Sequence, residues 1–139
     1  MKRVLVDTNV ILDVLRDRAP HAKASTAVWA AIETGLAEGL LAAHAITTIH
    51  YLIRKEQGAA KAGRTISEML RVFAVAMIDG GVIQQALQMS WPEFEDSVTA
   101  AAAQIAGCDL IVTRDPKGFR NSPIPVMTPE AAAPVLLKA

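Results

Sequence analysis

The chain has 139 residues, a length that predicts one domain with a hydrophobic core of its own. Hydrophobic residues make up 52% of the chain and aromatic residues only 4%, and 14 basic residues balance 14 acidic ones to a formal net charge of +0. These values exclude a disordered chain and argue against a generic basic nucleic-acid-binding module.

The N-terminal third predicts two strands and three helices. Val4–Val6 is a short apolar run that ends at Asp7, as expected for a buried parallel strand. The elements predicted next, in chain order, are a helix opening at Thr8-Asn9, a helix at 21–38, a weak strand at 39–43 and a helix at 46–57 that ends at Gly58.

The rest of the chain continues this alternation. The predicted elements are a helix at 60–73, a strand at 75–78, helices at 82–90 and 94–106, a strand at 110–113, a turn at 115–118, a strand at 125–127 and a C-terminal helix. Strands that alternate with helices predict an α/β fold, here a single three-layer α/β/α domain over residues 1–139 with a mainly parallel central sheet.

The sequence also predicts a cytoplasmic protein. One cysteine, Cys108, cannot form an internal disulfide. The apolar start of the chain resembles a signal peptide, but Asp7, Asn9 and Asp13 interrupt it too early. No apolar run is long enough to span a membrane.

Three aspartates follow strands or open a helix where parallel α/β folds bind ligands. Asp7 and Asp115 come after apolar strands, and Asp96 opens the helix at 94–106. Three carboxylates on one sheet edge repel one another unless a cation neutralises them, and oxygen ligands suit Mg²⁺ or Mn²⁺. Each also has an ordinary structural interpretation: Asp7 as a helix cap, Asp96 as a partner of the helix dipole, and Asp115 in a type I turn.

Charge is unevenly distributed in spite of the neutral total. No Lys or Arg lies between Arg71 and Arg114, whereas residues 54–71 hold five basic and two acidic residues, a net charge of +3. Such a stretch can follow a phosphate backbone, although a solvated helix face explains it as well.

With these residues in view, the sequence resembles the PIN-domain family, and within it the VapC-type toxins of bacterial toxin–antitoxin pairs. The similarity rests on the opening Val4-Leu5-Val6-Asp7-Thr8-Asn9 and on the later Phe94-Glu95-Asp96 and Thr113-Arg114-Asp115, in order and spacing. The resemblance implies a ribonuclease that depends on Mg²⁺ or Mn²⁺, is often dimeric, and is neutralised by a cognate antitoxin.

The resemblance also assigns expected roles to individual residues. Asp7, Asp96 and Asp115 would bind metal, Asn9 would orient Asp7, and Thr113 would form a hydrogen bond within the site or to its water. The family usually has a glutamate early in the helix after the second strand, where this sequence has His50.

His50 leaves several interpretations open. Imidazole is a poor ligand for Mg²⁺, so the change could favour Mn²⁺, give a phosphate contact, or weaken catalysis, and a partly buried structural histidine is equally compatible.

The resulting hypothesis is a metal-dependent endoribonuclease that hydrolyses RNA phosphodiester bonds. The alternative is a catalytically weakened PIN-like module that binds RNA or protein. A small-molecule phosphatase ranks lower, because Asp7-Thr8-Asn9 lacks the second acid of an Asp-x-Asp motif. Trp29, Leu36 and Tyr51 are candidates for a dimer or antitoxin surface.

Overall fold

The structure, a computed structural model, describes residues 1–138. Its five strands form one parallel sheet in the order β3-β2-β1-β4-β5. The strands are β1 (Arg3–Val6), β2 (Glu38–Ala42), β3 (Phe73–Ala76), β4 (Leu110–Val112) and β5 (Val126–Met127). The helices are α1 (Thr8–Leu15), α2 (Ala22–Glu33), α3 (Ala43–Gln57), α4 (Ala59–Val72), α5 (Gly80–Met89), α6 (Phe94–Ile105), the 3₁₀ helix η1 (Pro116–Phe119) and α7 (Pro129–Leu137).

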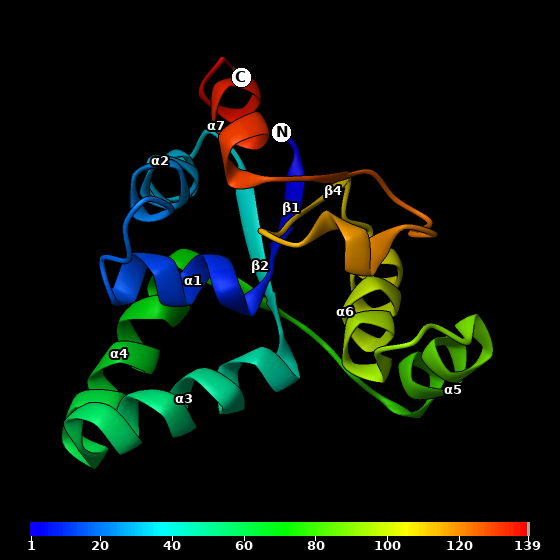
Figure 1. Cartoon of the computed structure of the whole chain (residues 1–139), viewed down its shortest axis with the longest axis horizontal. Helices are drawn as coiled ribbons and strands as arrows, with labels where there is room; N and C mark the ends of the chain where they lie inside the picture. The colour runs from blue at the N-terminus through cyan, green and yellow to red at the C-terminus, as the bar shows by residue number, and fades with distance from the viewer. Residues whose placement is uncertain (139) are drawn as a thin grey trace.

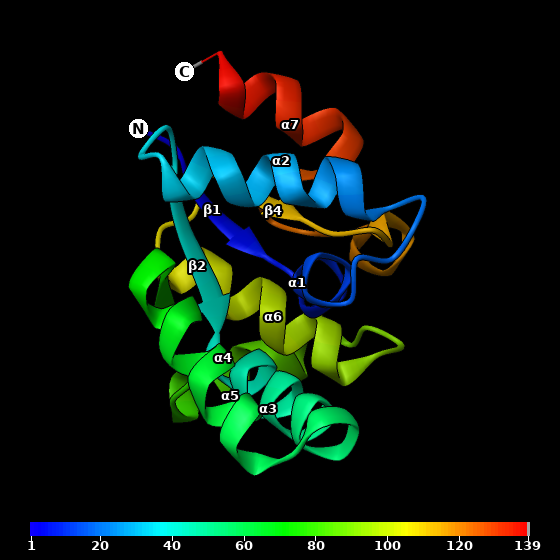
Figure 2. The ribbon, with the colours of Figure 1, turned by 90° about the vertical axis from the view of Figure 1, so that its left-hand side faces the viewer.

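Helices cover both faces of the sheet and confirm the predicted α/β fold class. In Figure 1 the sheet runs through the centre, with α1 to α4 on one side and α5 and α6 on the other. Figure 2, turned toward the first side, shows α2 in front of the sheet with α7 beside it. No helix within the described residues is long and apolar enough to cross a membrane.

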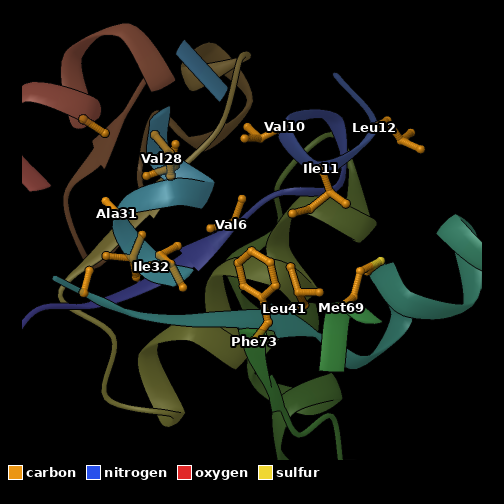
Figure 3. Close-up of a cluster of buried hydrophobic side chains, with 14 of the residues drawn as sticks. Val6, Val10, Ile11, Leu12, Val28, Ala31, Ile32, Leu41, Met69 and Phe73 are labelled. Atoms are coloured by element: carbon orange, nitrogen blue, oxygen red, sulfur yellow. The ribbon is translucent and has the colours of Figure 1, made fainter. Parts of the chain in front are cut away.

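The side chains of each strand alternate between two apolar layers because successive strand residues point to opposite faces. Val4 and Val6 of β1 belong to the core cluster beneath α1 to α4 and α7, whereas Leu5 packs with α5 and α6. Figure 3 shows the first cluster, where Val6 and Leu41 of the sheet lie among side chains from α1, α2 and α4. The second cluster includes four consecutive alanines of α6, whose small side chains allow that helix to lie close to the sheet.

The strand order creates a topological switch point beside β1. The chain runs outward from β1 to β2 and β3, then returns to place β4 on the other side of β1. In parallel sheets a crevice forms beyond the carboxyl ends of the strands at such a point. The residues that follow β1 and β4, Asp7 and Thr113, therefore lie next to each other.

Several element boundaries differ from those predicted. Helix α3 begins at Ala43 rather than at residue 46, because β2 runs directly into it without a side-chain cap. Helix α2 ends at Glu33, just before Gly35 takes a positive φ of 85°. Strand β3 occupies 73–76 instead of 75–78.

Trp29 and Leu36 are less exposed than expected for residues of a dimer or antitoxin surface. Both are only partly exposed and pack against the first core cluster, where the Trp29 ring meets Phe73 edge-on at 5.0 Å. Tyr51 is exposed as expected, at 60%. The periodicity of apolar residues could not tell which of these positions belong to the core and which to the surface. Trp29 and Leu36 become partly buried only when α2 packs on the sheet.

Candidate active site

Asp7 and Thr113 join the ends of the two central strands. The backbone N–H of Asp7 donates to the Val112 carbonyl at 2.9 Å, which extends the pairing of β1 and β4 by one residue. The fully buried Thr113 hydroxyl donates to Asp7 Oδ2 at 2.8 Å, and the Thr8 N–H donates to Asp7 Oδ1. Asp7 is therefore both the N-cap of α1 and a carboxylate held in one orientation.

Asn9 links α1 to the segment after β4. Its amide Nδ2 donates to Thr113 Oγ1 at 3.4 Å, and its Oδ1 accepts the backbone N–H of Arg114 at 3.2 Å. The predicted contact of Asn9 with Asp7 is thus indirect and passes through Thr113. The Asp115 N–H also donates to Thr113 Oγ1, at 3.1 Å, so one hydroxyl organises the backbone on which Asp115 sits.

Arg114 is anchored below this segment by a buried acid that the sequence analysis did not single out. Its Nε donates to Asp13 Oδ2 at 2.6 Å, and Asp13 is completely buried. Arg18 lies 3.6 Å from the other Asp13 oxygen. An acid within the apolar stripe of α1 is the sequence signal that could have identified Asp13, because it places a charge on the face turned toward the sheet.

Asp96 and Asp115 converge beside Gly118. A Cβ added to Gly118 would lie 2.7 Å from Asp96 Oδ2 and 3.5 Å from Asp115 Oδ2. Asp115 stands at the N-cap of η1, yet its side chain makes no capping hydrogen bond, and the N-cap of α6 is Glu93 rather than Asp96. Neither carboxylate is therefore needed to cap its helix, and both face the same small space.

The electrostatics of this edge disfavour three ionised carboxylates. The pKa of Asp96 is raised to about 6, mainly by burial and then by the charges of Asp7 and Asp115. Burial also raises the pKa of Asp7, against the opposing effect of its hydrogen bonds to Thr113 and Thr8. Among residues 1–138 no basic side chain forms an ion pair with any of the three. A bound cation would relieve this repulsion.

The donor set fits a magnesium-type ion better than a closed transition-metal site. In the described part of the chain, no three or more His, Cys, Asp and Glu side chains lie close enough together to hold a metal ion between them. Mg²⁺ is usually held by one or two carboxylates and keeps several waters, so the carboxylates of Asp96 and Asp115 meet its needs.

The histidine nearest this edge is His44, which the sequence analysis missed. Its Nε2 lies 3.3 Å from Thr99 Oγ1 and 4.0 Å from Glu95 Oε1, and burial lowers its pKa, with the charges of Glu95 and Asp7 opposing the shift. His50 is half-buried on the same helix, six residues or about 9 Å farther along. His44 lies at this edge because it comes two residues after the end of β2.

Comparison with known proteins shows the family of this chain. The model of the PIN domain matches residues 3–117, which include every residue of the acidic edge. The chain belongs to the PIN-domain family. A curated relative of this PIN domain is Ribonuclease VapC1 of Aquifex aeolicus, 26% identical over 134 residues that cover 93% of this chain and 92% of the relative.

Solved structures share the fold of this PIN domain at low sequence identity. VapBC2 from Rickettsia felis, crystallised with a promoter DNA fragment, has a TM-score of 0.70 at 10% identity and covers 91% of this chain and 98% of the other. VapC20 of Mycobacterium tuberculosis, described as a toxin that cleaves the sarcin–ricin loop, has a TM-score of 0.63 at 16% identity, covering 78% and 86%. The predicted PIN-like architecture is confirmed.

Proposed function

We propose that this PIN domain, spanning residues 1–139, is a metal-dependent endoribonuclease and the toxin of a toxin–antitoxin pair. The observation that carries the proposal is the pair of carboxylates Asp96 and Asp115 next to Gly118, with the charge of Asp7 near enough to raise the pKa of Asp96. None of the three has a basic partner in residues 1–138. Family membership and the relative named a ribonuclease support the same reaction.

Asp7, Asp96 and Asp115 would hold one or two Mg²⁺ or Mn²⁺ ions. When bound, such an ion lowers the pKa of its water and stabilises charge on the attacked phosphate, so no dedicated protein base is required. Thr113 fixes the orientation of Asp7 and, with Asn9, the backbone that carries Asp115. Both are proposed as positioning residues, acting through hydrogen bonds that hold the carboxylates.

The charged surface supports an RNA substrate. The basic side chains of the 54–71 stretch are all exposed, but the stretch begins about 16 Å along α3 from its first residue, so it would contact flanking RNA. Lys117 is exposed next to Asp115 and can reach a phosphate, whereas the Nε of Arg114 is occupied by Asp13.

The alternative of a catalytically weakened binding module is not favoured. It rested on His50, and the three aspartates and their supporting hydrogen bonds are present without any contribution from that residue. A role of His50 in metal choice or phosphate binding stays a prediction.

The proposal extends to partners and location. A cognate antitoxin is supported by the fold shared with VapBC complexes, and we propose a cytoplasmic homodimer that this antitoxin inhibits. Co-expression with the product of a small gene directly upstream tests the pairing: growth arrest by the protein alone and its relief by the neighbour are expected.

Cleavage of a structured RNA with Mn²⁺ tests the enzymatic claim. Asp7→Asn and Asp96→Asn should each lower the rate at least about 100-fold, because several kcal/mol of transition-state stabilisation depend on the ion. Asp109→Asn is the matched control, since Asp109 precedes β4 at the opposite sheet edge and binds the Arg3 backbone there. Equal rates for wild type and Asp7→Asn would refute the proposal.

A further inference from the structure

A cleft of about 280 Å³ adjoins the acidic edge, between the turn before α6 and the segment around η1. Trp91, Glu93 and Asp96 line it from one element, and Lys117, Arg120 and Asn121 line it from the other. Building on the nuclease function above, we propose that this cleft binds one nucleotide of the RNA, next to the phosphate that is cleaved. The base of this nucleotide would stack on Trp91, and the phosphate of the same nucleotide would lie against Lys117 and Arg120.

The cleft and the acidic edge share a wall. Asp96 lines the cleft, and its Oδ2 is the atom that a Cβ on Gly118 would approach to 2.7 Å. The absence of a side chain at Gly118 leaves the passage between the two sites open. A strand with one phosphate beside Asp96 therefore has its neighbouring nucleoside within reach of the cleft. The volume, close to the lower end of about 300–1,000 Å³ for ligand pockets, suits one nucleoside.

Trp91 is held as a platform. Its ring meets Phe119 edge-on, with centroids 5.8 Å apart and planes at 85°, and Phe119 is buried in the second core cluster. Trp91 itself is only half-buried, so part of the indole stays exposed toward the cleft. Stacking on such a ring holds any base, because every base has a π-face.

The charges in the cleft favour a nucleotide over a peptide of one sign. Lys117 and Arg120 are exposed and form no ion pair within the described residues, so both are available to a phosphate. Glu93 and Asp96 lie on the other side of the cleft and would repel an acidic peptide. Lys117 and Arg120 would in the same way repel a basic peptide. A nucleotide carries its charge at one end and a neutral ring at the other.

Binding of CMP and of ribose 5-phosphate, with Mg²⁺ present, tests the cleft by calorimetry. Trp91→Leu should weaken CMP binding about 5- to 150-fold, the factor that corresponds to base–aromatic stacking, while ribose 5-phosphate is unaffected. Trp91→Phe keeps an aromatic ring and should restore much of the affinity. Lys117→Ala with Arg120→Ala should weaken both ligands.

A control variant and a fluorescence measurement accompany these variants. Lys23→Ala removes an exposed charge on α2, across the sheet from the cleft, and should change neither ligand's affinity. Trp29→Phe leaves Trp91 as the only tryptophan, so CMP should quench the fluorescence of this variant. Unchanged CMP affinity in a folded Trp91→Leu protein, or equal affinity for CMP and ribose 5-phosphate, would overturn the proposal.

Kinetics with an RNA substrate separate the cleft from the nuclease function. Trp91→Leu should raise KM by a similar factor with little change in kcat, as expected when uniform binding is lost. If RNA is cleaved but KM is unchanged in Trp91→Leu, the cleft proposal fails and the nuclease stands. If CMP binds through Trp91 but no RNA is cleaved, the nuclease fails instead. Loss of antitoxin binding in Trp91→Leu with CMP affinity unchanged would make the cleft a protein-docking site and refute the proposal.

Discussion

Replacing Asp96 by asparagine should stabilise the metal-free protein near neutral pH. Burial and the charges of Asp7 and Asp115 raise the pKa of Asp96 to about 6, from an ordinary value of 3.8. Between these two values the folded state binds more protons than the unfolded state, so the free energy of unfolding falls as pH rises through this range. Above pH 6 the ionised Asp96 is a constant cost to the folded protein.

The size of that cost follows from the shift. Two pKa units correspond to about 3 kcal/mol at most, and because Asp96 is only half-buried, solvent screening reduces this to about 1 kcal/mol. An asparagine has nearly the same shape and no charge. At pH 7.5 in EDTA, the free energy of unfolding of Asp96→Asn should therefore be about 1 kcal/mol higher than that of wild type. This corresponds to a rise in Tm of about 3 °C.

Urea and thermal unfolding from pH 4.5 to 8 measure this difference. The advantage of Asp96→Asn should shrink as the pH falls to 4.5 and disappear only below about 3.8, where the wild-type carboxyl is protonated in both the folded and the unfolded state. Mn²⁺ should reverse the order at pH 7.5, because it stabilises the wild type by binding to the folded form. Asp109→Asn serves as the control and should show no such pH-dependent gain. An Asp96→Asn protein that is less stable than wild type at pH 7.5 in EDTA would refute the reasoning.

Three further substitutions test the supporting structure. Arg114→Ala leaves the buried Asp13 without its nearest partner and should cost about 3 kcal/mol in urea unfolding; adding Asp13→Asn should recover part of that loss, and an additive double variant would contradict the pairing. Gly118→Ala puts a methyl 2.7 Å from Asp96 Oδ2, so RNA cleavage should fall about 10-fold or more with little change in Tm, and wild-type activity would argue against a site there. Gly39→Ala places a Cβ 2.7 Å from a core side chain and should lower the unfolding free energy by about 1–3 kcal/mol in the same denaturation assay, with wild-type stability showing that the core yields.

Net charge alone hides how charge is distributed along this chain. A total of +0 argued against nucleic acid, yet it averages an exposed basic stretch at 54–71 with an acidic edge around Asp96. The proposed nuclease needs both on one domain, because the RNA backbone is attracted by the first and a cation by the second.

Local pattern was sufficient to place the acidic edge. Apolar runs identify β1 and β4, and the carboxyl ends of parallel strands meet at one sheet edge, so Asp7 and Asp115 were expected to lie together. Asp96 was expected at this edge as well, because it lies at the start of a helix, and helices in a parallel α/β fold start at the edge where the strands end. The family resemblance added the expectation of a Thr113 hydrogen bond within the site or to its water, and the Thr113 hydroxyl donates to Asp7 Oδ2.

Other features depended on contacts between residues far apart in the sequence. Asp13 meets Arg114 across about a hundred residues, and no periodicity in α1 specifies that partner. His44 lies near enough to Asp7 for that charge to act on its pKa, because it comes two residues after β2, whereas His50 lies about 9 Å farther along α3.

By itself, then, the sequence determined the α/β class, the order of the elements and the three acids, because apolar periodicity and strand ends are local properties. Only the tertiary structure decided which strand lies next to which, where α3 begins, and that Trp91, Lys117 and Arg120 border one cleft beside Asp96. These features depend on the packing free energy of the whole core, which no short stretch of sequence determines by itself.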